Sequence, residues 1–324
     1  MIGGNYIYIN LPLLELLELR RRKKKISAAM KLPVIDLSSR DSVSTAIAIR
    51  QACIEYGFFY LVNHGVEKEL GKAFDESRSF FSLPMNQKMK LARKQFRGYT
   101  PLDPALGIQG DSKESYYIGP IADSANAKLN QWPSEESLGN WRSSMESFYW
   151  KLFEAGKKLF SLIALSLNLD QHFFEKIGAI DKPSAFLRLL RYPGEMGGHE
   201  EICSAHSDCG ALTLLITDGV PGLQICRDKS KEPRVWEDVS YMEGAFIVNI
   251  GDLMERWTNC LYKSTMHRVK RTGKERYSMA FFLDPHPDCV VECIETCCSQ
   301  SSPPRFSPIR SGDYMHELFT ISPV

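Results

Sequence analysis

A histidine and an aspartate stand two residues apart in the segment CSAHSDCGALTLL, which runs from Cys203 to Leu215. Residues two apart in an extended chain point to the same side, so His206 and Asp208 could serve one site together. The apolar, β-favouring run that follows them indicates a strand at this position. Such a pair can hold a metal ion, or it can be an ordinary polar strand end that faces water.

A third candidate ligand is His267, in the strand-like segment KSTMHRVKR, 59 residues after Asp208. Two imidazoles and one carboxylate suit Fe(II), and three protein ligands on one face leave positions open for oxygen and a second reactant. Zinc also accepts two histidines and an aspartate, so the residue types alone leave the metal open.

A cation and a hydroxyl follow in the segment GKERYSMAFFLDP. On a strand, Arg276 and Ser278 share one face with Ala280 and Phe282, which places a guanidinium on an apolar wall. A guanidinium binds a carboxylate through two parallel hydrogen bonds, and a neighbouring hydroxyl can donate another. The alternative is an arginine paired with an acidic residue of the chain itself. The preceding KRTGKE, with Gly273, predicts a hairpin turn between two antiparallel strands.

These residues resemble the H-x-D…H and R-x-S signatures of the plant-type 2-oxoglutarate and Fe(II)-dependent dioxygenases, the isopenicillin N synthase-like family. The order of these motifs along the chain and the spacings between them agree with those of the family. The likeness continues through LPVIDLS, GFFYLVNHGV, RGYTPL, KESYYIG, NQWP and GAFIVNIGDLMERWTN, and so covers nearly everything after residue 30. The resemblance implies a mainly β fold with packed helices, in which the core is a double-stranded β-helix, or jelly roll.

The resemblance also assigns roles to individual residues. Those expected to hold Fe(II) are His206, Asp208 and His267. Those expected to bind the distal carboxylate of 2-oxoglutarate are Arg276 and Ser278, assisted by Tyr192. In the family this tyrosine belongs to an N-x-Y-P pattern, whereas here the segment reads LRYP, with Leu190 where asparagine is common.

The activity that the resemblance implies is oxidation of a small organic molecule, by default hydroxylation. It would use O2 and 2-oxoglutarate, release succinate and CO2, and take ascorbate as a reductant. Desaturation, ring closure and demethylation stay open. Some relatives are oxidases that use the same three ligands without 2-oxoglutarate and bind a substrate carboxylate with R-x-S, so this motif does not separate the two. A non-catalytic binding protein on the same scaffold would be expected to lack a ligand, and all three are present.

The formal net charge of +1 hides a basic block, Arg20 to Lys25. Residues 1–29 hold six of the 40 basic residues and two of the 39 acidic ones, which leaves 34 and 37 for the remainder. The chain after residue 29 therefore lacks the excess of basic residues that nucleic-acid binding requires. No apolar run reaches the roughly 18 residues of a membrane span, and nine cysteines without a clear framework fit a reducing cytosol. We expect a cytoplasmic monomer.

Three stretches of the chain differ in pattern. We expect residues 1–29 to lie outside the fold as a disordered or marginally helical extension; a start at Met30 and an organelle transit peptide are the alternatives. Residues 30–184 predict a helix-rich region that packs on the core. Residues 185–324 show short strand-like segments broken by turns, and we expect them to form the jelly-roll core that binds Fe(II) and 2-oxoglutarate, within one domain overall.

Periodicity predicts the elements that precede this core. Strands are expected at LPVIDLS, GFFYLVN and KESYYIG. Helices are expected at 42–56, 67–92 and 141–168, of which the last has the strongest apolar stripe. The segment RGYTPLDPALG is expected to be a loop because of its glycines and prolines.

Overall fold

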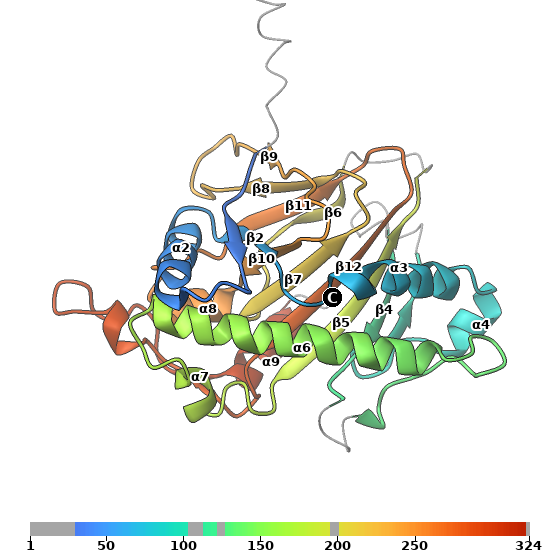
Figure 1. The fold of residues 1–324 in the computed structure, drawn as a ribbon, viewed down its shortest axis with the longest axis horizontal. Coiled ribbons are helices and arrows are strands. Elements are labelled where there is room, and N and C mark those ends of the chain that lie inside the picture. The colour runs from blue at the N-terminus through green and yellow to red at the C-terminus, as the bar shows by residue number, and fades with distance from the viewer. Residues whose placement is uncertain (1–29, 103–112, 122–126, 195–200, 322–324) are drawn as a thin grey trace, which may run out of the picture.

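The computed structural model describes residues 30–102, 113–121, 127–194 and 201–321. The expected extension at residues 1–29 lies outside them. Two β-sheets face each other, and helices cover the outer side of the larger sheet (Figure 1). The inner faces of the two sheets pack through two small apolar clusters, one of which joins Tyr192 and Ala280 of the large sheet to Cys203 and Val269 of the small one. The jelly-roll core that the sequence predicts is confirmed.

The large sheet has eight strands in the order β1-β2-β10-β7-β12-β5-β4-β3. All its pairs are antiparallel except β1 with β2, which is parallel. The strands are β1 (Val34–Asp36), β2 (Phe58–Val62), β3 (Gly98–Thr100), β4 (Glu114–Ile118), β5 (Ser184–Tyr192), β7 (Leu212–Thr217), β10 (Phe246–Ile250) and β12 (Arg276–Asp284). Four of these strands come from the part of the chain before residue 184.

The small sheet has four strands in the order β6-β11-β8-β9. They are β6 (Glu201–His206), β8 (Leu223–Cys226), β9 (Glu237–Asp238) and β11 (Met266–Lys270). A separate two-stranded ribbon pairs β13 (Val290–Val291) with β14 (Ile309–Arg310).

The longest helix, α6 (Trp141–Ser166), runs along the outer face of the large sheet. Its stripe includes Met145, Leu152 and Leu159, which are fully buried. At Gly156 an added Cβ would lie 2.5 Å from Leu283, so the missing side chain lets the helix approach β12 closely. The other helical segments are α2 (Ser42–Glu55), α3 (Glu67–Phe81), α4 (Met85–Lys90), α7 (Phe173–Lys176), α8 (Asp252–Trp257), α9 (Ser311–Ile321) and the 3-10 turn η2 (Glu295–Cys297).

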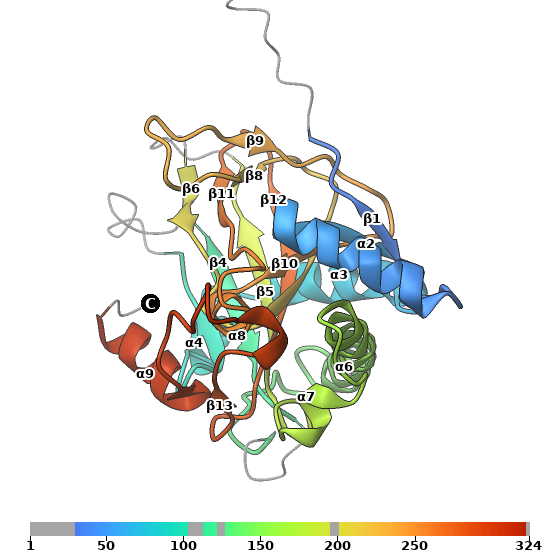
Figure 2. The same ribbon diagram turned by 90° about the vertical axis from the view of Figure 1, so that its left-hand side faces the viewer.

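The C-terminal helix α9 lies on the opposite side of the large sheet from α6 (Figure 2). Its first residues line the same cavity as the inner face of β12. Within the described ranges, no helix combines the length and the apolar character needed to cross a membrane.

Most of the predicted elements form, and three details differ. The expected helix over 67–92 is two helices, because Pro84 follows the end of α3 and adopts an extended conformation before α4. Part of the expected loop forms β3, which pairs with β4. The predicted hairpin between β11 and β12 is wrong: these strands belong to different sheets, and the turn at Gly273 (φ 73°) carries the chain from one sheet to the other.

Candidate active site

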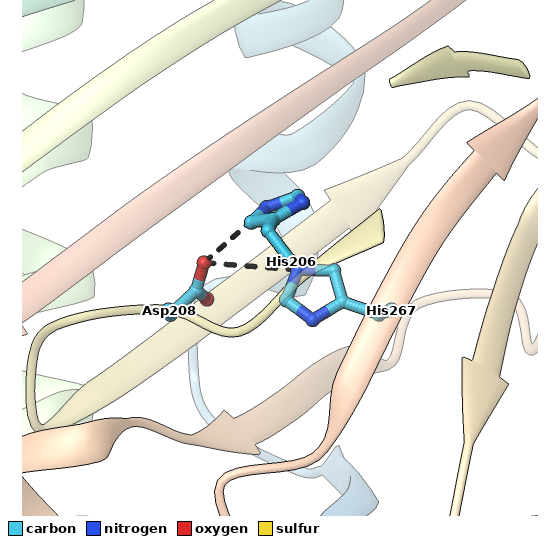
Figure 3. A group of neighbouring side chains, drawn as sticks. All are labelled: His206, Asp208 and His267. Atoms are coloured by element: carbon cyan, nitrogen blue, oxygen red, sulfur yellow. Dashed lines mark ion pairs between the residues drawn. The ribbon is translucent and has the colours of Figure 1, made fainter. Parts of the chain in front are cut away.

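The three candidate metal ligands meet at one end of the small sheet. His206 is the last residue of β6 and pairs directly with His267 on β11. Asp208 follows β6 and points back toward both rings (Figure 3). Its Oδ1 lies 3.7 Å from Nε2 of His206 and 3.6 Å from Nε2 of His267. One candidate ligand atom from each residue lies within 4.8 Å of the other two, and no other such group occurs among the described residues.

Hydrogen bonds orient the Asp208 carboxylate. Its Oδ2 accepts from Thr213 Oγ1 and from Asn249 Nδ2, each at 2.7 Å, while Oδ1 faces the two histidines. Burial opposes ionisation of this group, but the two histidines and the two hydrogen bonds outweigh it and hold the Asp208 pKa below its usual range. The carboxylate is therefore ionised and ready to bind a cation.

Backbone carbonyls fix which nitrogen each imidazole presents. Nδ1 of His206 lies 2.8 Å from the Ser204 carbonyl, and Nδ1 of His267 lies 3.3 Å from the Thr265 carbonyl. When Nδ1 donates to a carbonyl, Nε2 has a free lone pair, which is the arrangement that metal-binding histidines adopt. The donor set of two Nε2 atoms and one carboxylate oxygen fits Fe(II).

The site opens to solvent on one side. The His206 side chain is 44% exposed, whereas those of Asp208 and His267 are 11% exposed. Burial disfavours protonation of His206, but Cys203 and Asp208 offset this and raise its pKa to about 9. For His267, burial dominates and lowers the pKa. A metal ion that binds here must therefore displace a proton from His206.

The predicted anion-binding residues also come together, between the sheets. Arg276 on β12 pairs directly with Tyr192 on β5, and its guanidinium carbon lies 5.0 Å from the centre of the Tyr192 ring. Arg276 Nη1 donates to Ser278 Oγ at 3.1 Å, and Nε donates to the Val220 carbonyl at 3.3 Å. All three predicted side chains are buried.

The described residues place no carboxylate within ion-pair distance of Arg276, although the residue is only 2% exposed. Among the residues that the structure describes, Arg276 is therefore not paired with an acidic residue of the chain itself. A buried guanidinium without a counter-charge fits an external carboxylate, since a buried charge is costly unless it is paired. This is the chemistry that 2-oxoglutarate requires.

A cavity of about 520 Å³ adjoins the candidate metal ligands. His206 and Asp208 contribute to its wall, together with residues of β4, β5, β12 and α9. Asp284, at the end of β12, also lines it and accepts a hydrogen bond from the Ala211 amide at 2.9 Å. Burial raises the pKa of Asp284 to about 7. The volume suits a small organic molecule.

The supporting residues Thr213 and Asn249 were missed at the level of sequence. Both are polar residues inside otherwise apolar strands, LTLLIT and FIVNI, and both are buried. A polar side chain in such a run needs a partner, so this was the available signal. Which partner it finds depends on β7 and β10 lying side by side next to Asp208.

Comparisons with known proteins cover nearly the whole described chain. Residues 32–135 match the family model described as non-haem dioxygenase in morphine synthesis N-terminal, and residues 183–285 match the model of the 2OG-Fe(II) oxygenase superfamily. Kihadalactone A synthase LFS of Citrus sinensis is 38% identical, covering 89% of this chain and 91% of its own. Azadirone synthase LFS of Melia azedarach is 36% identical, covering 89% and 92%. The crystal structure of a full-length Neurospora crassa protein with alpha-KG and 5-formyluracil superposes with a TM-score of 0.81 at 28% identity, covering 91% and 98%.

Proposed function

Since this chain belongs to the 2OG-Fe(II) oxygenase superfamily, we propose that it oxidises a small organic metabolite, by default through hydroxylation. The superfamily uses Fe(II), 2-oxoglutarate and O2, and the chain is an oxidoreductase of this kind. Fe(II), 2-oxoglutarate and O2, which the sequence predicts, are thereby confirmed, whereas ascorbate stays a prediction. The identity of the metabolite and the form of the oxidation are the proposed part.

We assign the metal to Nε2 of His206, Nε2 of His267 and Oδ1 of Asp208. When bound, iron supplies the redox chemistry that couples the oxidation of 2-oxoglutarate to succinate and CO2 with the oxidation of the metabolite. The protein holds these three atoms ready: the strand pairing of His206 with His267 fixes the distance between the rings, and Thr213 and Asn249 prevent the Asp208 carboxylate from turning away.

We assign the distal carboxylate of 2-oxoglutarate to Arg276, Ser278 and Tyr192. Arg276 would bind it through N–H groups that do not already donate to Val220 and Ser278, and the Ser278 and Tyr192 hydroxyls would orient it. Ser278 pairs with Leu190 across β5, the position where the family commonly has asparagine. We call Arg276, Ser278 and Tyr192 together the anion seat. Leu190, beside it, packs with Val269 and Ala280, and this apolar wall strengthens the attraction between the guanidinium and a carboxylate.

One observation carries the proposed function: two histidines and an aspartate present ligand atoms within 4.8 Å while their remaining polar atoms are already hydrogen-bonded. The direct test is O2 consumption by the purified protein with Fe(II) and a panel of small metabolites, with and without 2-oxoglutarate. We expect consumption to depend on 2-oxoglutarate. Consumption with a metabolite alone would instead identify an oxidase that does not use it.

We further propose that the protein works as a cytoplasmic monomer in plant specialised metabolism, with neither nucleic acid nor membrane as a partner. The near balance of 40 basic and 39 acidic residues supports the exclusion of nucleic acid. Two plant synthases among the relatives support the metabolic setting. Sedimentation of the purified protein tests the monomer, and microscopy of the tagged chain tests its location.

A further inference from the structure

Strands β5 and β12 form a continuous strip on the inner face of the large sheet. The strip begins at the anion seat, where Tyr192 pairs with Arg276. Alternate residues of β5 point the same way, so Arg188 and Phe186 follow along this face, opposite Ala280 and Phe282. Both Arg188 and Phe186 line the cavity beside the candidate metal ligands. The strip therefore carries a second guanidinium, that of Arg188, in the cavity where we place the metabolite.

The two arginines on this strip cannot hold the same anion. Arg188 is four residues from Tyr192, the direct partner of Arg276, which separates the two positions by roughly 13 Å along the sheet. Arg276 belongs to the anion seat, which we assign to the distal carboxylate of 2-oxoglutarate. Arg188 shares the cavity with His206 and Asp208 instead.

The contacts of Arg188 leave one of its N–H groups without an acceptor. One Nη group lies 3.5 Å from the Ser115 hydroxyl, and the guanidinium carbon lies 4.7 Å from the centre of the Tyr117 ring. Its Nε is buried and has no hydrogen-bond partner. In the part of the chain that the structure describes, no carboxylate lies within ion-pair distance of it. A buried guanidinium nitrogen without an acceptor is costly, and a ligand carboxylate would satisfy it.

Two further cations lie near Arg188 on the cavity wall, whereas the carboxylates of Asp208 and Asp284 line its metal-ligand side. Arg93 lies over the same Tyr117 ring at 4.7 Å, and Lys113 also lines the cavity. Burial lowers the pKa of Lys113 to about 8; nearby Cys203 opposes this shift and the Arg188 charge adds to it, so the two cations lie within each other's field. Aromatic and apolar side chains also line the cavity, among them Tyr117, Phe186, Phe282 and Met315.

We propose that the metabolite oxidised by this protein carries a carboxylate, which Arg188 binds, and a flat apolar body that packs between Phe186, Phe282 and Tyr117. This rests on the proposed function, because it places the metabolite in the cavity next to the metal ligands. Arg188 is thus a specificity-determining residue for the metabolite, and its role is separate from that of Arg276.

Matched pairs of probes test this. Monocarboxylic aryl acids that fit the cavity, such as 1-naphthylacetate, are compared with their neutral amides by calorimetry, under anaerobic conditions with Fe(II) and saturating 2-oxoglutarate. Saturation keeps the probe away from the Arg276 seat. We expect the wild-type protein to bind at least one acid about tenfold to a hundredfold more tightly than its amide.

The Arg188→Met variant is expected to lose this preference while it binds the amide about as well as the wild-type protein does. Arg188→Lys keeps the charge and should retain part of the preference for the acid. If Arg188→Met does not fold, the reduced preference of Arg188→Lys tests the proposal in its place. The matched control is Arg227→Met, because Arg227 also lies over a tyrosine ring, that of Tyr56 at 5.4 Å, but does not line the cavity.

Two results would overturn the proposal: no acid in the panel preferred over its amide by the wild-type protein, or the same preference in Arg188→Met. Neither result depends on turnover. If the protein bound acids through Arg188 but never converted 2-oxoglutarate to succinate, the proposed function would fail while the carboxylate preference stood, so the two failures are distinguishable.

Discussion

Replacing Arg276 with methionine should remove the affinity for 2-oxoglutarate and leave the metal ligands in place. Arg276 is 2% exposed and already donates to Ser278 and Val220, and its remaining N–H groups are available for a ligand carboxylate. Truncating one partner of a buried, hydrogen-bonded charge pair costs about 2 to 5 kcal/mol. A loss of about 2.7 kcal/mol, near the lower end, raises the dissociation constant about a hundredfold. For Ser278→Ala we expect a loss of about 1 kcal/mol, which is about fivefold.

Thermal unfolding measures this difference without any turnover. At 2-oxoglutarate a hundredfold above its dissociation constant, ligand binding stabilises the wild-type protein by about 2.7 kcal/mol. The same concentration stabilises Arg276→Met by only about 0.4 kcal/mol, because it then equals the raised dissociation constant. For a domain of this size, each kcal/mol shifts the melting temperature by about 2 °C, so the expected shifts are about 5 °C and below about 1 °C.

The control for this experiment is Arg227→Met, whose guanidinium lies on the surface between Glu237 and Tyr56. It should respond to 2-oxoglutarate as the wild-type protein does. An Arg276→Met protein that 2-oxoglutarate stabilised by the full 5 °C would refute the assignment of Arg276 to the co-substrate. A smaller effect of Arg276→Met than of Ser278→Ala would refute the reasoning that the charge carries most of the affinity.

Three further predictions concern the surroundings of the metal ligands. Thr213→Val removes one of the two hydrogen bonds that orient Asp208, so we expect Fe(II) affinity to fall about tenfold to a hundredfold in a titration, with the fold unchanged by circular dichroism. The pKa of Asp284 is raised to about 7 by burial, so the folded state holds a proton that the unfolded state loses above about pH 4. The stability that the protonated Asp284 contributes is therefore fully present below about pH 4 and is lost as pH rises through about 7. In urea unfolding, the stability of Asp284→Asn relative to the wild-type protein should therefore rise as pH rises across that window. A difference in unfolding free energy that did not change with pH would contradict this. Gly210→Ala should destabilise the protein, because the added Cβ would lie 1.7 Å from the Asp284 carboxylate, and an unchanged melting temperature would show that the site has more room than the structure gives it.

The sequence predicted the positions that depend on local spacing. His206 and Asp208 are two residues apart, and Arg276 and Ser278 are two residues apart, so each pair shares a face wherever its strand lies. The meeting of His206 with His267 was inferred from residue chemistry and family resemblance, and the structure brings them together as direct partners of β6 and β11. The jelly-roll fold followed from the same resemblance.

What the sequence could not predict depends on which strands become neighbours. A glycine turn between β11 and β12 looks the same whether it closes a hairpin or crosses between two sheets, so the hairpin prediction was wrong. Likewise, the hydrogen bond of Asn249 to Asp208, and the approach of Arg188 to Ser115 and Tyr117, join segments that are far apart in the chain. Such contacts follow from tertiary packing: the sequence can indicate that a buried polar side chain such as Asn249 needs a partner, but it does not say which one.

The most direct test of the central claim is succinate release from 2-oxoglutarate by the Fe(II)-loaded protein in air, with ascorbate as the reductant and with Asp208→Ala beside the wild-type protein. The control is Asp228→Ala, which removes a carboxylate from an exposed turn. We predict that the wild-type protein and the control release succinate and that Asp208→Ala, still folded, releases none, because we assign Asp208 to the metal. Succinate release by Asp208→Ala at the wild-type rate would contradict the assignment of His206, Asp208 and His267 as the iron site.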